Sequence, residues 1–234
     1  MSENIKKTTK AFRVDLDSNK NQIMLKPSTR PFSNQAHQVN EAAEKIHELI
    51  KNAPYSNDNI VLNRNEIKEA FFSPFKPQLK NAQVFLSHSH ADRNKALEVK
   101  DYLESKTKRK VSIDSLFWDY KDDVLNELAE YDDISKIEDA FTLILRESLQ
   151  DMIEKCPYFV FLQSSNSVSN QGLSRITYSA WIYEELKIAH SISTISESRS
   201  IPMMESMQVF HDISPFLESL KTITLSELSR MINS

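Results

Sequence analysis

Glycine is almost absent from this chain, since Gly172 is the one glycine among 234 residues. The P-loop and the GxGxxG dinucleotide fingerprint both need several glycines, because their backbones adopt positions that other residues do not tolerate. The sequence therefore excludes ATP- or GTP-driven chemistry on either scaffold. If a nucleotide binds to this chain, a loop of another kind must hold it.

Cysteine and long apolar runs are equally scarce. The single cysteine, Cys156, excludes an internal disulfide framework and a cysteine-based zinc site. No uncharged apolar run approaches the roughly 20 residues that span a bilayer. The N-terminal segment MSENIKKTTK does not lead into the apolar stretch of a secretion signal. We therefore expect a cytoplasmic protein with no membrane partner.

The charge balance is mildly acidic, with 33 acidic and 29 basic residues and a net charge of -4. No basic field is present to attract nucleic acid, so we expect no direct nucleic-acid binding. Hydrophobic residues make up 40% and charged residues 26% of the chain, as in an ordinary globular protein. This length suits one large domain, or a compact domain with an accessory module.

Residues 1–79 predict a small, mainly helical accessory module. Apolar residues alternate from Phe12 to Leu16, a polar DSNKNQ segment follows, and Ile23–Leu25 comes next, which favours a hairpin. Apolar residues recur at helical spacing over 36–52 and 65–72. The proline-containing segment SPFKPQLKN is typical of a linker. We interpret this module as a sensor, an oligomerisation element or a docking surface for a partner.

Residues 80–234 show predicted strands that alternate with predicted helices. The strands are expected at 83–87, 111–113, 157–163 and 201–204, and the helices at 91–105, 139–155, 178–192 and 227–232. This alternation predicts an α/β fold with a parallel sheet covered on both faces. In such folds, polar residues at the carboxyl ends of the strands build the site. Those residues are Ser87-His88-Ser89-His90, Asp114-Ser115 and Gln163-Ser164-Ser165.

Two catalytic alternatives can be drawn from these polar residues alone. His88 and His90 suggest a metal site, but a metal would need a third and a fourth ligand, and no other histidines form a ligand pair. A Ser-His-Asp triad would need a nucleophile, and the chain has no GxSxG motif. We therefore predict no metal site and no hydrolase triad.

A more specific signal opens the predicted helix at 178–192. Trp181 and Glu185 are spaced i and i+4, so they share one helix face. The indole can pack against the sheet while the carboxylate points along the same side. In the alternative interpretation, Glu184 and Glu185 are solvated charges and Trp181 belongs to the core.

Four segments in order resemble the Toll/interleukin-1 receptor (TIR) domain family, prokaryotic NAD+-cleaving type. They are QVFLSHSHAD, VSIDSLFWDY, PYFVFLQSSN and SAWIYEELKIA, and the resemblance covers residues 80–234. It implies a flavodoxin-like doubly wound parallel sheet, preceded by the module at 1–79. It also implies an NAD+ glycohydrolase or ADP-ribosyl cyclase, an NAD+ nucleosidase that takes NAD+ as substrate and uses no cofactor. The catalytic carboxylate would be Glu185.

The resemblance also implies which residues surround the substrate, namely Ser87, His88, Ser89, His90, Asp114, Trp118 and Trp181. Phe117 or Trp118 would stack on nicotinamide or adenine. The chain departs from the family in its first loop, where His88 and His90 stand in place of basic residues and Arg93 lies just beyond. The acid-rich segment 119–139 is longer than usual, so we expect an inserted helix or a solvated lid there.

By analogy with prokaryotic family members, the expected role is antiphage defence. Activation would come from a homo-oligomer formed through TIR–TIR contacts, and a trigger protein would dock on residues 1–79. One alternative is a non-catalytic TIR interaction or scaffold module in immune signalling. Another is a small-molecule sensor or receiver on the same fold, although the first strand ends in SHSH without the acidic pair of a phosphoacceptor.

Overall fold

The computed structural model of the chain describes residues 9–27, 36–56, 59–60, 62–73, 81–131, 133, 135, 138–193 and 210–234. The chain divides into two compact units. The first combines residues 1–28, 82–114 and 150–234, and the second combines residues 29–81 and 115–149. Both units are assembled from segments that are far apart in sequence. The expected division between 1–79 and 80–234 therefore does not coincide with the units of the structure.

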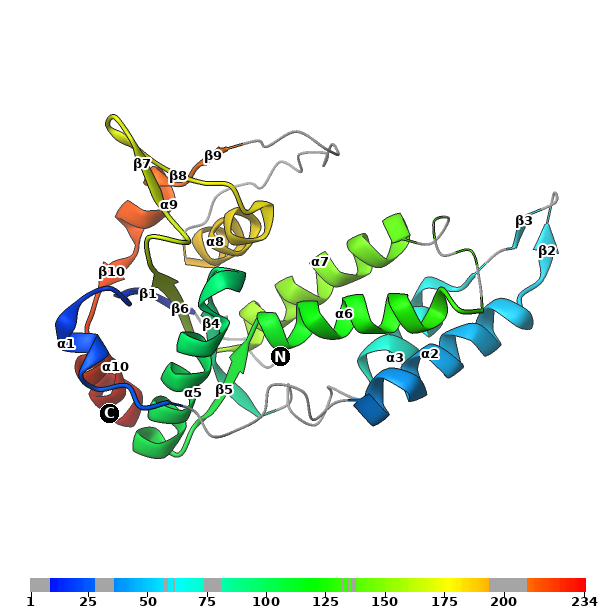
Figure 1. The fold of residues 1–234 in the computed structure, drawn as a ribbon, viewed down its shortest axis with the longest axis horizontal. Helices are drawn as coiled ribbons and strands as arrows, with labels where there is room; N and C mark the ends of the chain where they lie inside the picture. The colour runs from blue at the N-terminus through cyan, green and yellow to red at the C-terminus, as the bar shows by residue number, and fades with distance from the viewer. Residues whose placement is uncertain are drawn as a thin grey trace, which may run out of the picture. The chain divides into compact units, whose positions relative to one another are not determined.

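A parallel sheet forms the centre of the first unit (Figure 1). Its five strands lie in the order β10-β1-β6-β4-β5, and all neighbouring strands run parallel. β6 is buried from Phe159 to Leu162, so both of its faces are covered, as in a sheet packed between helices. This arrangement confirms the expected α/β class with a parallel sheet. The strands are β1 (Lys10–Asp15), β4 (Ala82–Ser87), β5 (Lys110–Ile113), β6 (Tyr158–Gln163) and β10 (Lys221–Thr222).

The strand order follows the flavodoxin-like expectation only in part. The first three strands of the sheet after residue 80 are β4, β5 and β6. Numbered 1, 2 and 3 in chain order, they lie side by side in the order 2-1-3, which is how the strand order of a flavodoxin-like sheet begins. The next two positions hold β1, from the N-terminal segment, and β10. After β6 the chain enters a separate antiparallel sheet, β7-β8-β9, which leaves the edge of β6 open to β1.

The predicted hairpin at 12–25 is wrong. β1 pairs along its whole length with β6 and also with β10, and α1 (Asn19–Gln22) follows it. Phe12, Val14 and Leu16 are buried, whereas Ile23 is 82% exposed. The alternating pattern was compatible with a hairpin arm or with a strand of the main sheet. Pairing with β6, about 150 positions further along the chain, decided between them.

The helices expected after residue 80 are present. They are α5 (Arg93–Thr107), α7 (Glu138–Lys155), α8 (Ala180–Ser193) and α10 (Leu225–Asn233). α10 begins with a capping box, in which Thr224 Oγ1 accepts from the Glu227 N–H and the Glu227 carboxylate accepts from the Thr224 N–H. α10 packs against α5, and α8 contacts β1. The central sheet is thus supported by helices from both halves of the sequence.

The small antiparallel sheet contains the single glycine. It consists of β7 (Ser169–Gln171), β8 (Ser174–Thr177) and β9 (His211–Asp212), followed by α9 (Ser214–Ser219). Gly172 and Leu173 connect β7 to β8, and Gly172 has φ +58°. A positive φ at the first of two loop residues is the pattern of a type II′ turn, which favours glycine at that position.

The second unit is mainly helical. It contains α2 (Ala36–Lys51), the short pair β2 (Tyr55–Ser56) and β3 (Asn59–Ile60), α3 (Arg64–Phe72), α6 (Ser115–Leu128) and most of α7. α2 contacts α3 and α6. α3 is joined to α7 by an edge-on contact of Phe71 with Phe141 and by an Arg64–Glu147 ion pair of 2.5 Å. The helices predicted at 36–52 and 65–72 therefore pack with a later segment. It includes α6, which begins at Ser115 and covers the first part of 119–139, where an inserted helix or a solvated lid was expected.

Two sequence predictions fall outside the described residues: the strand at 201–204, and the prolines of the 73–81 linker. Within the described residues, no helix has the length and apolar character needed to cross a bilayer. Cys156 is buried and unpaired with another cysteine, and burial raises the pKa of its thiol to about 12.

Candidate functional site

The candidate site lies at the carboxyl ends of β4 and β5 in the first unit. β4 ends at Ser87, and Asp114 follows the last residue of β5. The Asp114 N–H donates to the Leu86 carbonyl over 3.3 Å, which holds the turn after β5 against the end of β4. Because the two strands are parallel neighbours, their polar end residues meet at one edge of the sheet.

His88 is bound to Asp114 by two contacts. Its Nδ1 lies in contact with Asp114 Oδ1, and its backbone N–H donates to Oδ2 over 3.4 Å. The two side chains are 0% and 5% exposed. Burial strengthens the electrostatic part of such a contact, because little water competes for it. The pair therefore fixes the orientation of Asp114.

Glu185 approaches the same place from α8 and is 0% exposed. Burial raises the pKa of its carboxyl well above the ordinary value, and the nearby charge of Asp114 raises it further. The Ser87 hydroxyl acts in the opposite direction, because it stabilises the ionised form. The neutral form of the Glu185 carboxyl is thus favoured to a higher pH than in an exposed glutamate.

Several polar atoms of this cluster have no well-aligned hydrogen-bond partner among the described residues. They are Ser87 Oγ, both ring nitrogens of His88 and both carboxyl oxygens of Glu185. Ser87 and Asp114 lie close enough to Glu185 to affect the pKa of its carboxyl. A buried polar atom without a partner costs about 1–3 kcal/mol, so a folded chain rarely gathers several of them without a functional reason.

The other predicted site residues have different environments. Ser89 is half-buried and precedes the short 3-10 helix η1 (His90–Asp92), and His90 is exposed. Trp181 is half-buried in the first turn of α8, one turn before Glu185. Trp118 lies in α6, which belongs to the second unit, and its side chain is outside the description. The structure thus brings Ser87, His88, Asp114 and Glu185 together.

The two histidines considered as metal ligands, His88 and His90, lie in different environments. His88 is buried against Asp114, whereas His90 is exposed. Among the described residues, no group of three or more His, Cys, Asp or Glu side chains could hold a metal ion.

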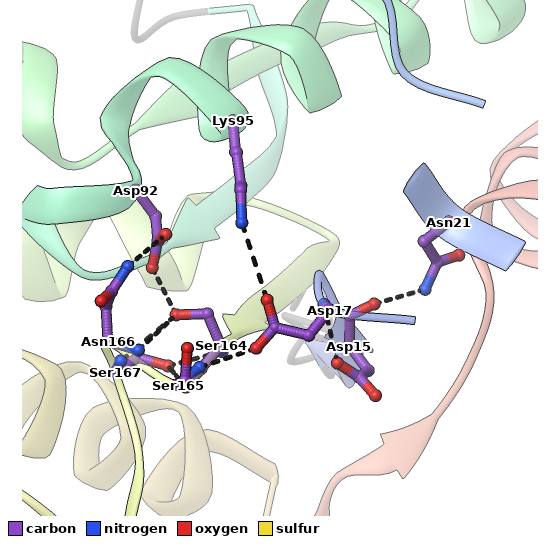
Figure 2. A network of polar contacts seen from close by, with 9 residues as sticks. All are labelled: Asp15, Asp17, Asn21, Asp92, Lys95, Ser164, Ser165, Asn166 and Ser167. Carbon is purple, nitrogen blue, oxygen red and sulfur yellow. Dashed lines mark hydrogen bonds and ion pairs between the residues drawn. The ribbon is translucent and has the colours of Figure 1, made fainter. Parts of the chain in front are cut away.

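A second polar network joins the loop after β6 to the start of α5, and Figure 2 shows it. The Ser164 hydroxyl donates to Asp92 Oδ2, and Asn166 Nδ2 donates to Asp92 Oδ1 over 2.9 Å. Ser167 Oγ accepts from the Ser164 N–H over 2.8 Å, and Ser164 Oγ accepts from the Ser167 N–H over 3.2 Å. Asp92 and Ser164 are 2% and 4% exposed, so these bonds form away from water.

The end of β1 extends this network (Figure 2). Asp17 Oδ2 accepts from the Ser165 N–H over 2.8 Å, and Asp17 Oδ1 lies 3.6 Å from Lys95 Nζ. These polar groups satisfy one another, so the network positions the loop after β6. Asp92 and Asp17 are not among the residues predicted from the sequence, although the Ser/Asn-rich run 164–170 is typical of a loop held by side-chain hydrogen bonds.

Comparisons with protein-family models, with curated proteins and with solved structures gave no match. A functional assignment for this chain therefore depends on the geometry of the cluster and on the four sequence segments described above. The residues whose chemistry bears on that assignment are Ser87, His88, Asp114 and Glu185.

Proposed function

We propose that this chain is a TIR-type NAD+ nucleosidase that cleaves the bond between nicotinamide and ribose, with Glu185 as the catalytic carboxylate. The main supporting observation is the position of Glu185. Its two carboxyl oxygens are buried without an aligned partner, beside Ser87 and Asp114 at the ends of parallel strands. Burial of an unpaired carboxyl disfavours the folded state, so a functional role accounts for its presence.

The chemistry suits one carboxylate. Nicotinamide leaves a pyridinium as a neutral molecule, so its departure requires no general acid. The C–N bond breaks with its electron pair going to nicotinamide, and positive charge develops on the ribose, as in glycoside hydrolysis. A carboxylate beside the ribose stabilises that charge. Water then attacks to give ADP-ribose and a proton, or an atom of the same ADP-ribose attacks to give a cyclic isomer.

This proposal requires the site to open. With Glu185 0% exposed, substrate reaches its carboxyl only when α8 or the strand-end loops move. We propose that assembly of several copies through TIR–TIR contacts drives this opening, and that a trigger protein acts through residues 1–79. Control of this kind suits a role in antiphage defence, because uncontrolled loss of NAD+ would harm the host.

The complete burial of Glu185 also favours the second candidate, a non-catalytic TIR interaction module. In that case, Glu185 would be a neutral structural acid of α8, and the strand-end cluster would serve only the fold. The two candidates differ in whether Glu185 ever contacts a substrate.

The deciding measurement is nicotinamide release from NAD+ by the full chain at high concentration, with and without a crowding agent. Glu185→Gln should abolish release. Glu184→Gln is the matched control, because the neighbouring Glu184 is also buried but pairs with Lys187 Nζ at 3.8 Å. Equal release from wild type and Glu185→Gln would refute the catalytic role. No release from a forced oligomer of the wild type would favour the interaction module.

A further inference from the structure

Three neighbouring strands of the central sheet each carry a buried polar atom that has no hydrogen-bond partner among the described residues. The atoms are Ser87 Oγ on β4, Gln163 Oε1 on β6 and Arg13 Nη1 on β1. β4, β6 and β1 lie side by side and run parallel. A buried donor or acceptor without a partner disfavours the folded state, so three of them on adjacent strands point to a ligand.

The register of the strands places these three side chains on one face of the sheet. Ser87 and Arg13 are both aligned with Phe161, and aligned side chains point to the same face. Gln163 lies two positions after Phe161, so it shares that face. α8 contacts β1, and Ser87 lies close enough to the carboxyl of Glu185 on α8 to affect its pKa. The three polar atoms therefore lie on the side of the sheet that faces Glu185.

Arg13 is a half-buried cation whose guanidinium is only partly engaged. Its Nε and Nη2 donate to Thr222 Oγ1 over 3.2 and 2.7 Å, and Nη1 is buried without an acceptor. Burial lowers the pKa of the Arg13 guanidinium, and the positive charge of Arg175 lowers it further, whereas Asp15 acts in the opposite direction. A bound anion would offset both the burial of this charge and its repulsion by Arg175.

The chemistry of the three atoms and their order across the sheet fit one kind of ligand. A guanidinium suits a phosphate, because its N–H groups match pairs of phosphate oxygens. A serine hydroxyl and an amide oxygen can bond sugar hydroxyls. Adjacent strands are about 4.8 Å apart, so Arg13 and Ser87 are separated by about 10 Å of sheet. In a dinucleotide, a phosphate likewise lies beyond the sugar that faces the catalytic carboxylate.

We propose that Arg13 is a substrate-binding residue that holds the pyrophosphate of NAD+. This inference rests on the proposed function and adds a contact to its site. It supplies a cation near Glu185, whereas the first loop has His88 and His90 in place of the basic residues of the family. Because β1 comes from the N-terminal segment, the nucleotide site would draw on residues from both sides of residue 80.

Binding of ADP-ribose tests this proposal without cleavage, because ADP-ribose keeps the pyrophosphate and has no nicotinamide to lose. Isothermal titration calorimetry of the full chain, as purified and as a forced oligomer, should detect binding to the wild type. Arg13→Gln should weaken this binding by about 10- to 100-fold, because charge-assisted hydrogen bonds are lost. Arg13→Lys keeps the charge but not the planar fork, so its affinity should be intermediate.

Lys221→Gln is the matched control, because it removes a neighbouring positive charge from the opposite face of the sheet. Lys221 is aligned with Phe12, whereas Thr222 is aligned with Arg13. Successive side chains of a strand point to opposite faces, so Lys221 and Arg13 point away from each other. Lys221 is also exposed. This variant should bind ADP-ribose as tightly as the wild type does.

Two results would overturn the proposal: equal affinities of a folded Arg13→Gln chain and the wild type, or no binding of ADP-ribose by the forced oligomer. If Arg13→Gln does not fold, nitrogen-15 spectra of the wild type decide. The side-chain N–H signals of Arg13, assigned through its own backbone, should shift when ADP-ribose is added. An unchanged Arg13 signal would contradict the proposal.

These outcomes are separable from those of the proposed function. Glu185→Gln should still bind ADP-ribose, because the phosphate contact does not use the carboxylate. Arg13-dependent binding without any nicotinamide release would support this inference and refute the nucleosidase. Where release occurs, Arg13→Gln should raise KM by a similar factor and change kcat little, because the phosphate is held equally before and during cleavage. An unchanged KM would refute this inference alone.

Discussion

Glu185 combines complete burial with a carboxyl group, and this makes the stability of the first unit depend on pH. In the unfolded chain, Glu185 ionises near the ordinary value of about 4.3. In the folded chain, burial and then the charge of Asp114 raise its pKa well above that value. Between the two values the folded state binds more protons than the unfolded state. Its contribution to stability is therefore complete below about pH 4.3 and is lost as pH rises through the folded pKa.

Glu185→Gln should remove this dependence. Relative to the wild type, its free energy of unfolding should increase by about 1.4 kcal/mol per pH unit above pH 4.3 and level off above the folded pKa. Urea unfolding at a series of pH values measures this difference. Glu184→Gln is the control, and parallel curves for the wild type and Glu185→Gln would contradict the raised pKa.

Asp92 has a structural role that can be tested by truncation. Asp92→Ala removes the acceptor for Ser164 Oγ and Asn166 Nδ2 and leaves the Ser164 hydroxyl buried without that partner. We expect a loss of about 1–3 kcal/mol in the free energy of unfolding, measured by urea titration. Lys95→Ala should cost less than about 1 kcal/mol, because its ion pair with Asp17 is long and largely exposed. Equal effects of the two substitutions would argue against the buried network.

At the scale of elements, β1 is the strand that joins the edge strand β10 to β6 in the central sheet. Leu16, directly after β1, is 0% exposed, and its N–H donates to the Gln163 carbonyl over 2.8 Å. Leu16→Ala should lower the free energy of unfolding by about 2–5 kcal/mol in urea titration. Ile23→Ala should change it by no more than about 0.5 kcal/mol, because Ile23 is 82% exposed. Similar effects would mean that β1 is not part of the core.

The position of β1 also predicts how a shortened chain behaves. A chain of residues 80–234 lacks β1, so β6 loses a neighbour on one side and β10 loses its partner strand. We expect this chain to show no cooperative unfolding transition in circular dichroism and no dispersed amide signals in NMR. A dispersed spectrum would instead support an independent domain beginning at residue 80.

At the scale of the molecule, the two tryptophans report on different units. Trp181 belongs to the first unit and Trp118 to the second. Chains with two compact units often unfold in more than one step. We expect the fluorescence transitions of Trp118→Phe and Trp181→Phe to have different urea midpoints. Coincident transitions, matching that of circular dichroism, would show that the units unfold together.

Much of the local structure followed from the sequence, because periodicity and end signals are properties of neighbouring residues. Helical spacing predicted α2, α3, α5, α7 and α8 within a few residues, and apolar runs predicted β4, β5 and β6. The parallel arrangement then placed Ser87 and Asp114 at one edge of the sheet. Their role with Glu185 stays a prediction until it is measured.

Tertiary structure decided what depends on distant partners. The alternation of the apolar residues Phe12, Val14 and Leu16 is typical both of a hairpin arm and of a strand in a larger sheet. This segment forms a strand of the main sheet because it pairs with the open edge of β6. Nothing near His88 in sequence indicates Asp114 as its partner, because 26 positions separate them. The raised pKa of Glu185 likewise comes from burial and then from Asp114, and neither is a property of its own helix. The sequence by itself thus determined the elements and the polar strand ends, while packing determined which residues meet, because contacts between distant segments depend on the tertiary structure.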